Sequence, residues 1–237
     1  MDGFIVGVSG GVDSALSSTL CALTGKPTLL VSMPIRQTSK EHERALDHIE
    51  DLTHRFDNVS SLEVDLTASF TQIEHDLPEE TRQDNLAMAN TRSRLRMLSL
   101  YAIGQSQGKL VCGTGNKVED FGIGFYTKYG DGGVDISPIG DLLKTEVWSL
   151  AKEVNVIDSI VTAKPTDGLW SDARSDEDQI GATYPELEWA MNYKGDGSIL
   201  SERQQTVLEI YNRLHKQNLH KMIPIPVCRI PDECRES

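Results

Sequence analysis

Short apolar segments alternate with longer amphipathic segments along the chain. Residues 4–8, 28–33 and 109–113 are apolar runs bounded by glycine or proline, a pattern that predicts buried strands. Residues 62–66 alternate between apolar and polar side chains, which predicts a weaker strand. Between these runs apolar residues recur every three or four positions, which predicts helices after Gly11 and over residues 38–56, 85–107, 141–154 and 201–217.

Strands that alternate with helices predict an α/β fold, with a mostly parallel sheet flanked by helices on both faces. The length of 237 residues fits one domain over residues 1–237, although two small domains are also compatible with it. Ligands in such folds bind beyond the carboxyl ends of the strands. The loops at Ser9, Pro34, Thr114 and Gly130 are therefore expected to face one crevice.

Residues 165–184 differ from the rest of the chain because they are polar, acidic and rich in turn-forming residues. A long segment of this composition is typical of a functional loop. We therefore predict a mobile lid over residues 165–184.

Charge and composition exclude several classes of protein. The chain has 23 Lys and Arg against 36 Asp and Glu, a net charge of −13, which argues against broad binding to nucleic acid. No apolar run is long enough to span a membrane, and residues 1–9 lack the pattern of a signal peptide. We therefore expect a cytoplasmic protein with neither a membrane nor a nucleic acid as a partner.

The four cysteines form no CxxC pair, so the sequence contains neither a zinc ribbon nor a thioredoxin-type motif. Cys21 and Cys112 lie in apolar segments and are expected to pack as small hydrophobic residues. Cys228 and Cys234 are close in sequence, but a reducing compartment is the simpler assumption for all four thiols.

The segment SGGVDS, residues 9–14, lies between a predicted strand and a predicted helix. Its glycines allow the backbone to approach a ligand closely, and the free N–H groups of the helix start favour a phosphate. The segment is not a Walker A loop, because no Gly-Lys-Ser/Thr follows the turn. The acidic Asp13 suits a phosphate site only if it holds Mg²⁺, and the alternative is an ordinary glycine-rich turn.

This segment resembles the pyrophosphate-binding loop of the N-type ATP pyrophosphatases, which have an adenine nucleotide alpha hydrolase-like fold. Four further segments resemble the NAD synthetases within that group: NTRSRLRM (90–97), GTGNKVE (113–119), FYTKYGDGGVD (125–135) and PIGDLLK (138–144). The string over residues 127–135 is the most specific of them. With KPT (164–166) and HK (220–221), the resemblance spans nearly the whole chain.

The resemblance implies a set of residues that bind ATP. They are Gly7, Val8, Ser9, Gly10, Gly11, Val12, Asp13 and Ser14, with Arg36 near the adenosine, Thr114 near the nucleotide, and Lys144 and Thr166 near the phosphates. It implies Asp13, Lys144 and Glu119 as catalytic residues and Asp13 and Glu119 as Mg²⁺ ligands, while the spacing to Lys128 leaves Asp120 as an alternative ligand. Without the resemblance, Arg36 and Lys144 would be read as surface residues.

The resemblance also implies a set of residues that hold deamido-NAD. They are Arg94, Lys128, Asp135, His220 and Lys221. Arg92, Arg94 and Arg96 alternate, so helical rotation directs them differently, and only one is expected to face the site while the others make surface or dimer contacts.

The implied reaction is the ATP-dependent amidation of deamido-NAD to NAD with ammonia, the last step of NAD biosynthesis. It passes through an acyl-adenylate and releases AMP and pyrophosphate. Ammonia is expected as the direct donor because 237 residues leave no room for the amidase domain of glutamine-dependent relatives, unless a separate glutaminase supplies it. A homodimer is implied as well. The alternatives are a tRNA sulfurtransferase, disfavoured by the charge and the scattered cysteines, and a non-catalytic nucleotide sensor.

Overall fold

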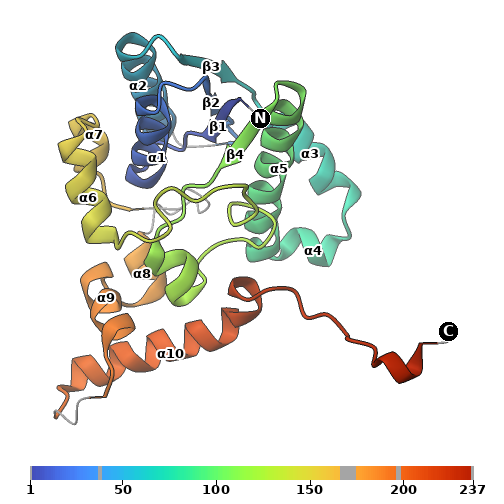
Figure 1. The fold of residues 1–237 in the computed structure, drawn as a ribbon, viewed down its shortest axis with the longest axis vertical. Coiled ribbons are helices and arrows are strands. Elements are labelled where there is room, and N and C mark those ends of the chain that lie inside the picture. The colour runs from blue at the N-terminus through green and yellow to red at the C-terminus, as the bar shows by residue number, and fades with distance from the viewer. Residues whose placement is uncertain (1, 37–38, 166–174, 196–198, 236–237) are drawn as a thin grey trace.

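A parallel sheet of four strands, in the order β3-β2-β1-β4, lies at the centre of the fold (Figure 1). The computed structural model describes residues 2–36, 39–165, 175–195 and 199–235. Its strands are β1 (Gly3–Gly7), β2 (Thr28–Ser32), β3 (Val59–Glu63) and β4 (Lys109–Cys112). The strand order reverses between β1 and β4, which creates the kind of switch point where α/β folds bind ligands. The predicted fold class is confirmed.

Helices cover both faces of the sheet because neighbouring residues of each central strand point to opposite sides. Ile5 packs in a core with residues of α3 (Thr67–Asp76) and α5 (Asn85–Ser106). Val6, the next residue, packs in a second core with residues of α1 (Val12–Leu23) and α2 (Ser39–Arg55). The continuous apolar character of β1 and β2 follows from burial on both faces.

A second group of helices follows the sheet. Its members are a π-helix, η1 (Val118–Ile123), and the helices α6 (Lys144–Glu153), α7 (Asp158–Val161), α8 (Asp176–Ile180), α9 (Tyr184–Asn192) and α10 (Glu202–Met222). Part of this group forms a core of its own, whereas α6 and α7 pack mainly against α1. Figure 1 shows α9 and α10 at the end of the molecule away from β3. Val118, Tyr184, Leu187 and Val207 are central to this core, which lies between η1, α9 and α10.

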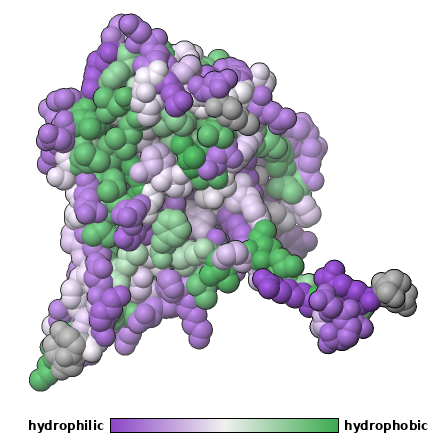
Figure 2. Space-filling view, in the orientation of Figure 1, coloured by the Kyte–Doolittle hydropathy of each residue, from purple (hydrophilic) through white to green (hydrophobic). Residues whose placement is uncertain are grey.

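The chain after α10 leaves the body as an extended segment that ends in a short turn of 3-10 helix, η2 (Asp232–Cys234) (Figures 1 and 2). Figure 2 shows hydrophobic side chains at the start of this segment and hydrophilic ones near its end. The exposed apolar residues of the segment include Ile225 and Val227.

The structure corrects several expected boundaries. β3 lies three residues before the predicted 62–66, because the alternation of Val64 and Leu66 reflects packing against the α5 core rather than pairing in the sheet. Helix α6 begins at Lys144 rather than at residue 141, and α10 continues to Met222 rather than ending at 217. The sequence analysis also did not predict α3, α7, η1, α9 and α4 (Glu79–Gln83).

Within the predicted lid, α8 is a helix rather than a loop, and residues 166–174 lie outside the described residues. A lid over residues 165–184 therefore stays a prediction. No helix in the described part of the chain combines the length and the apolar character needed to cross a membrane.

Candidate active site

A cavity of about 650 Å³ opens at the carboxyl ends of β1 and β4. Every residue of the predicted phosphate loop lines it: Gly7, Val8, Ser9, Gly10, Gly11, Val12, Asp13 and Ser14. Thr114, Glu119, Asp120 and Lys144 line it too, so residues from both helical groups meet in one cavity.

The loop is held in shape by hydrogen bonds within itself. The Ser9 and Ser14 hydroxyl oxygens lie 3.0 Å apart, and the Ser14 hydroxyl donates to the Gly11 carbonyl at 3.0 Å. Gly10 has a φ of +85°, and a side chain there would also collide with the backbone of Glu41 in α2. No side chain caps the start of α1 at Gly11. Its first N–H groups can therefore bind an anion in the cavity.

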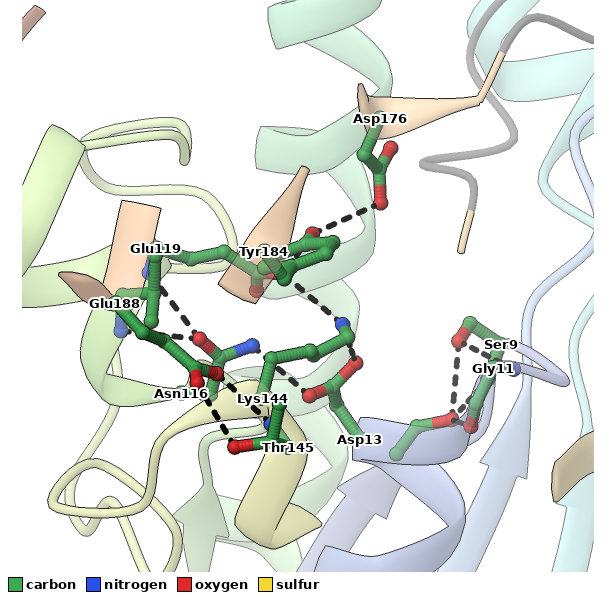
Figure 3. A network of polar contacts seen from close by, with 12 residues as sticks. Ser9, Gly11, Asp13, Asn116, Glu119, Lys144, Thr145, Asp176, Tyr184 and Glu188 are labelled. Atoms are coloured by element: carbon green, nitrogen blue, oxygen red, sulfur yellow. Dashed lines mark hydrogen bonds and ion pairs between the residues drawn. The ribbon is translucent and has the colours of Figure 1, made fainter. Parts of the chain in front are cut away.

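Lys144 lies at the centre of a charged cluster opposite this loop (Figure 3). Its ammonium nitrogen donates to Asp13 Oδ2 at 2.5 Å and to Glu119 Oε1 at 3.0 Å. Lys144 is 1% exposed, so the surface position that its sequence context suggested is wrong. Asp13 comes from the first turn of α1, Glu119 from η1 and Lys144 from the first turn of α6. The structure thus brings together the three residues expected to be catalytic.

The cluster keeps Lys144 charged. Burial alone would lower the pKa of Lys144, but the carboxylates of Asp13 and Glu119 outweigh burial and raise it above its usual value. The protein therefore holds a buried cation beside the cavity, where its interaction with a phosphate is stronger than in bulk water.

Asn116 is a residue of this cluster that the sequence analysis did not select as a site residue. It is 0% exposed, and its side-chain amide donates to Asp13 Oδ1 at 3.0 Å. Its side-chain oxygen accepts from the backbone N–H groups of Val118 and Glu119 at 3.1 and 3.2 Å. Asn116 therefore fixes Asp13 and the start of η1 together. The only local sign of this role in the sequence is the position of Asn116, two residues before a helix.

Asp120 differs from Glu119 in its surroundings. Glu119 already accepts from Lys144 and from the hydroxyl of Tyr184, whereas no side chain among the described residues bonds Asp120. Burial, followed by the charge of Glu119, raises the pKa of Asp120 to about 8. A half-buried carboxylate without a partner is disfavoured in its charged form. Asp120 is therefore a carboxylate of the cavity that a bound cation would stabilise.

Three of the five residues expected to hold deamido-NAD lie at another place, around a shallower groove between α5 and the start of the C-terminal segment. Arg94, Lys128 and Lys221 line this groove, and Lys221 also lines the main cavity. Arg94 donates to the Lys128 carbonyl at 3.2 Å, and Lys128 donates to the His220 carbonyl at 2.6 Å. These cations are thus held by main-chain oxygens rather than by carboxylates.

Three predicted site residues line neither the main cavity nor the groove. Asp135 accepts from the Tyr101 hydroxyl at 3.0 Å and from the Val111 N–H at 2.8 Å, so it ties α5 to β4. Arg36 pairs with Glu74 of α3 at 2.6 Å, outside the cavity. The His220 side chain is exposed and lines neither space. Thr166 lies outside the described residues.

Comparisons with known proteins agree with this geometry. The chain is 35% identical to the NH(3)-dependent NAD(+) synthetase of Methanosarcina acetivorans, over 96% of this chain and 90% of the relative. It superposes on the NMN synthetase of Francisella tularensis with a TM-score of 0.82 at 31% identity, covering 98% and 90% of the two chains. For the NH3-dependent NAD synthetase of Campylobacter jejuni the TM-score is 0.75 at 25% identity, with 96% and 90% covered.

The family model described as NAD synthase matches residues 1–224, a range that includes the phosphate loop, the Lys144 cluster and the groove cations. With a match over nearly the whole chain, and a cavity built from the same segments that carried the sequence resemblance, this chain belongs to the NAD synthase family.

Proposed function

We propose that the cavity carries out the ATP-dependent amidation of deamido-NAD to NAD with ammonia, through an acyl-adenylate. Membership of the NAD synthase family makes the chain a ligase that forms a carbon–nitrogen bond. The observation that supports this use of the cavity is the buried Lys144 cluster opposite an open helix start, which together make a site for a polyphosphate.

The reaction has two steps. A carboxylate oxygen of the nicotinate ring attacks the α-phosphorus of ATP, and the bond to pyrophosphate breaks. Ammonia then attacks the carbonyl carbon of the adenylate, AMP leaves with the electron pair of the broken carbon–oxygen bond, and the nitrogen loses a proton. The first step is needed because a free carboxylate is a poor electrophile.

We assign the chain's residues to the first step. The N–H groups at the start of α1, with Ser9 and Ser14, bind the β- and γ-phosphates. Lys144 neutralises the charge that develops on the departing pyrophosphate, the usual electrostatic contribution to such transfers. Since Lys144 now bonds Asp13 and Glu119, it must share or exchange these partners when the nucleotide enters.

Asp13 and Asp120 fit a Mg²⁺ ion better than Asp13 and Glu119, because Glu119 is already engaged by Lys144 and Tyr184, whereas no hydrogen bond engages the Asp120 side chain in the described part of the chain. Mg²⁺ takes one or two carboxylates and completes its shell with phosphate oxygens and water. Among the described residues, no group of three or more His, Cys, Asp or Glu side chains could hold a metal ion, so phosphate oxygens and water would supply the remaining ligands. When bound, the ion would neutralise phosphate charge.

A paired substitution distinguishes the two carboxylates. Asp120→Asn is expected to weaken Mg²⁺ binding about 10- to 100-fold, while Glu119→Gln has a smaller effect on it. The measurement is calorimetric titration of Mg²⁺ into the protein with a non-hydrolysable ATP analogue. A larger loss for Glu119→Gln would return the ligand role to Glu119.

We also propose a homodimer. The groove that carries Arg94 and Lys128 is bordered by exposed apolar residues of α5 and of the C-terminal segment, among them Leu98 at 67% and Ile225 at 64% exposure. A second copy of the chain would cover these residues and complete the acceptor end of the site. Light scattering is expected to give a dimer, and Leu98→Glu a monomer.

A cytoplasmic location is consistent with four cysteines that form no disulfide, since thiols persist in a reducing compartment.

A mononucleotide acceptor is the second candidate, because the Francisella structure is named an NMN synthetase. The two acceptors share the reacting carboxylate and differ in the adenylate half, which a groove lined by Arg94 and Lys128 would hold. We expect the dinucleotide to be preferred.

The test combines the protein with ATP, Mg²⁺, ammonium or glutamine, and each acceptor in turn. NAD formation, followed with a coupled dehydrogenase, is expected with ammonium and deamido-NAD. Asp13→Ala is the inactive control. ATP binding without any product would indicate a nucleotide sensor. A higher kcat/KM for the mononucleotide than for deamido-NAD would show that the mononucleotide is the preferred acceptor.

A further inference from the structure

Helix α9 contacts the Lys144 cluster through two of its side chains. Tyr184 and Glu188 both face this cluster, and neither lines the cavity. They are four residues apart, so they lie one above the other on one side of the helix. Their contacts reach the two residues that begin α6, Lys144 and Thr145.

Tyr184 acts on Lys144 in two ways. Its hydroxyl donates to Glu119 Oε1 at 2.5 Å, the same oxygen that accepts from Lys144. Its ring lies 4.7 Å from the Lys144 ammonium, within the range of a cation–π contact. The side chain is 0% exposed, and Trp148 packs against the ring edge-on with centroids 6.0 Å apart. Tyr184 therefore has no freedom to turn away from the cluster.

Glu188 acts on the backbone that carries Lys144. Its carboxylate accepts from the Thr145 N–H at 2.9 Å and from the Thr145 hydroxyl at 2.8 Å. The residue before α6 is Leu143, whose side chain cannot cap a helix, so Glu188 supplies an acceptor from a different helix. A lysine at the first position of a helix is disfavoured by the helix dipole, and a carboxylate close to this turn offsets that cost.

From these contacts we infer that Tyr184 and Glu188 are positioning residues that hold Lys144 and Glu119 where the nucleotide phosphates arrive. The expected effect of these residues on turnover rests on the proposed function, whereas their expected effect on ATP binding does not. Neither side chain lines the cavity, although the Tyr184 hydroxyl also bonds Asp176, which does. Both residues therefore act on a bound nucleotide through the residues that they contact, chiefly Lys144 and Glu119.

The variants Tyr184→Phe and Glu188→Gln remove one hydroxyl and one charge while keeping the shape of each side chain. Each is expected to weaken the binding of ATP and to lower kcat, both by about tenfold, and to change the KM for the acceptor less than twofold. Matched controls on or next to α9 are Tyr193→Phe and Glu186→Gln, whose side chains lie away from the cluster. These controls are expected to bind ATP as the wild type does.

The decisive measurement is a double-mutant cycle with Lys144→Met, which keeps the apolar stem of the lysine. If Tyr184 acts through Lys144, the tenfold loss of ATP affinity disappears when Tyr184→Phe is made in the Lys144→Met protein. Calorimetry gives the affinities, and a thermal melt of each variant identifies any that fail to fold. The cycle is repeated with Glu188→Gln, so the test does not depend on one variant.

Two results would overturn the inference. In the first, the Tyr184→Phe and Glu188→Gln variants bind ATP and turn over like their controls. In the second, their loss of ATP affinity persists in full in the Lys144→Met protein. A wild-type protein that binds ATP and forms no product would contradict the proposed function instead. The ATP affinities of the variants would still decide whether α9 positions Lys144.

Discussion

The two ends of the site are built differently. At the ATP end, Asp13, Glu119 and Lys144 are bonded side chain to side chain, and Lys144 is buried. At the acceptor end, Arg94 is exposed and the cations contact main-chain carbonyls. A preorganised charge is most useful where charge develops during the reaction, whereas a part of the substrate that does not react needs only to be held.

The largest expected effect on the ATP end comes from removing the side chain of Lys144. Lys144→Ala leaves Asp13 and Glu119 as two buried carboxylates without their cation. We expect kcat to fall about 1,000-fold and the free energy of unfolding to fall by about 3 kcal/mol. Steady-state kinetics and urea denaturation measure the two effects. Lys152→Ala, an exposed lysine of the same helix, is the control, and equal effects from both variants would contradict the assignment.

Acid is expected to lower the free energy of unfolding through His48 of α2, which bonds α1, the helix that follows the phosphate loop. The His48 Nε2 atom lies 2.9 Å from the Ser18 hydroxyl of α1, and burial lowers the pKa of His48 to about 4. The folded-state pKa is below the usual 6.5, so the unfolded chain binds the proton first. Stability is therefore complete above pH 6.5 and is lost as the pH falls toward 4, by up to about 3 kcal/mol.

Urea denaturation at pH 7.5 and at pH 5 measures this loss. His48→Leu is expected to reduce the difference in stability between the two pH values. His54→Leu, a variant of an exposed histidine of the same helix, should keep the wild-type difference. The same pH dependence in the His48→Leu and wild-type proteins would show that other groups cause it.

The smallest expected effect belongs to the acceptor end. Arg94→Ala removes one exposed cation from the groove, so we expect the KM for deamido-NAD to rise about tenfold while kcat changes less than twofold. Arg36→Ala is the matched control, because Arg36 pairs with Glu74 outside the cavity. If Arg36→Ala raised the KM for ATP, Arg36 would regain the role that the sequence resemblance implied.

The same contrast explains what could be predicted from the sequence. The loop over residues 9–14 is a local motif, so its position between a strand and a helix was predicted correctly. The burial of Cys21 and Cys112 was also predicted from their apolar neighbours, and it is confirmed. Helical periodicity identified α1, α2, α5, α6 and α10, because each buries one side against a core.

Features that depend on distant contacts could not be predicted. Lys144 has the sequence context of a surface lysine, and only its pairing with Asp13 explains its burial. The roles of Asn116 and Tyr184 likewise arise from partners 103 and 65 positions away. No local pattern contains such pairings, and the resemblance to a family gave Lys144 but neither of the other two.

The bond between Asp13 and Lys144 also bears on how the protein folds. It joins residues 131 positions apart, so a long chain segment must be ordered before the bond can form. While the chain is being synthesised, the strands of the sheet and the phosphate loop emerge before α6 and α9, whereas a domain folds as a unit. An unfinished chain that ends before α6 therefore has the phosphate loop without the lysine, and it lacks the charge that the transfer of an adenylyl group requires.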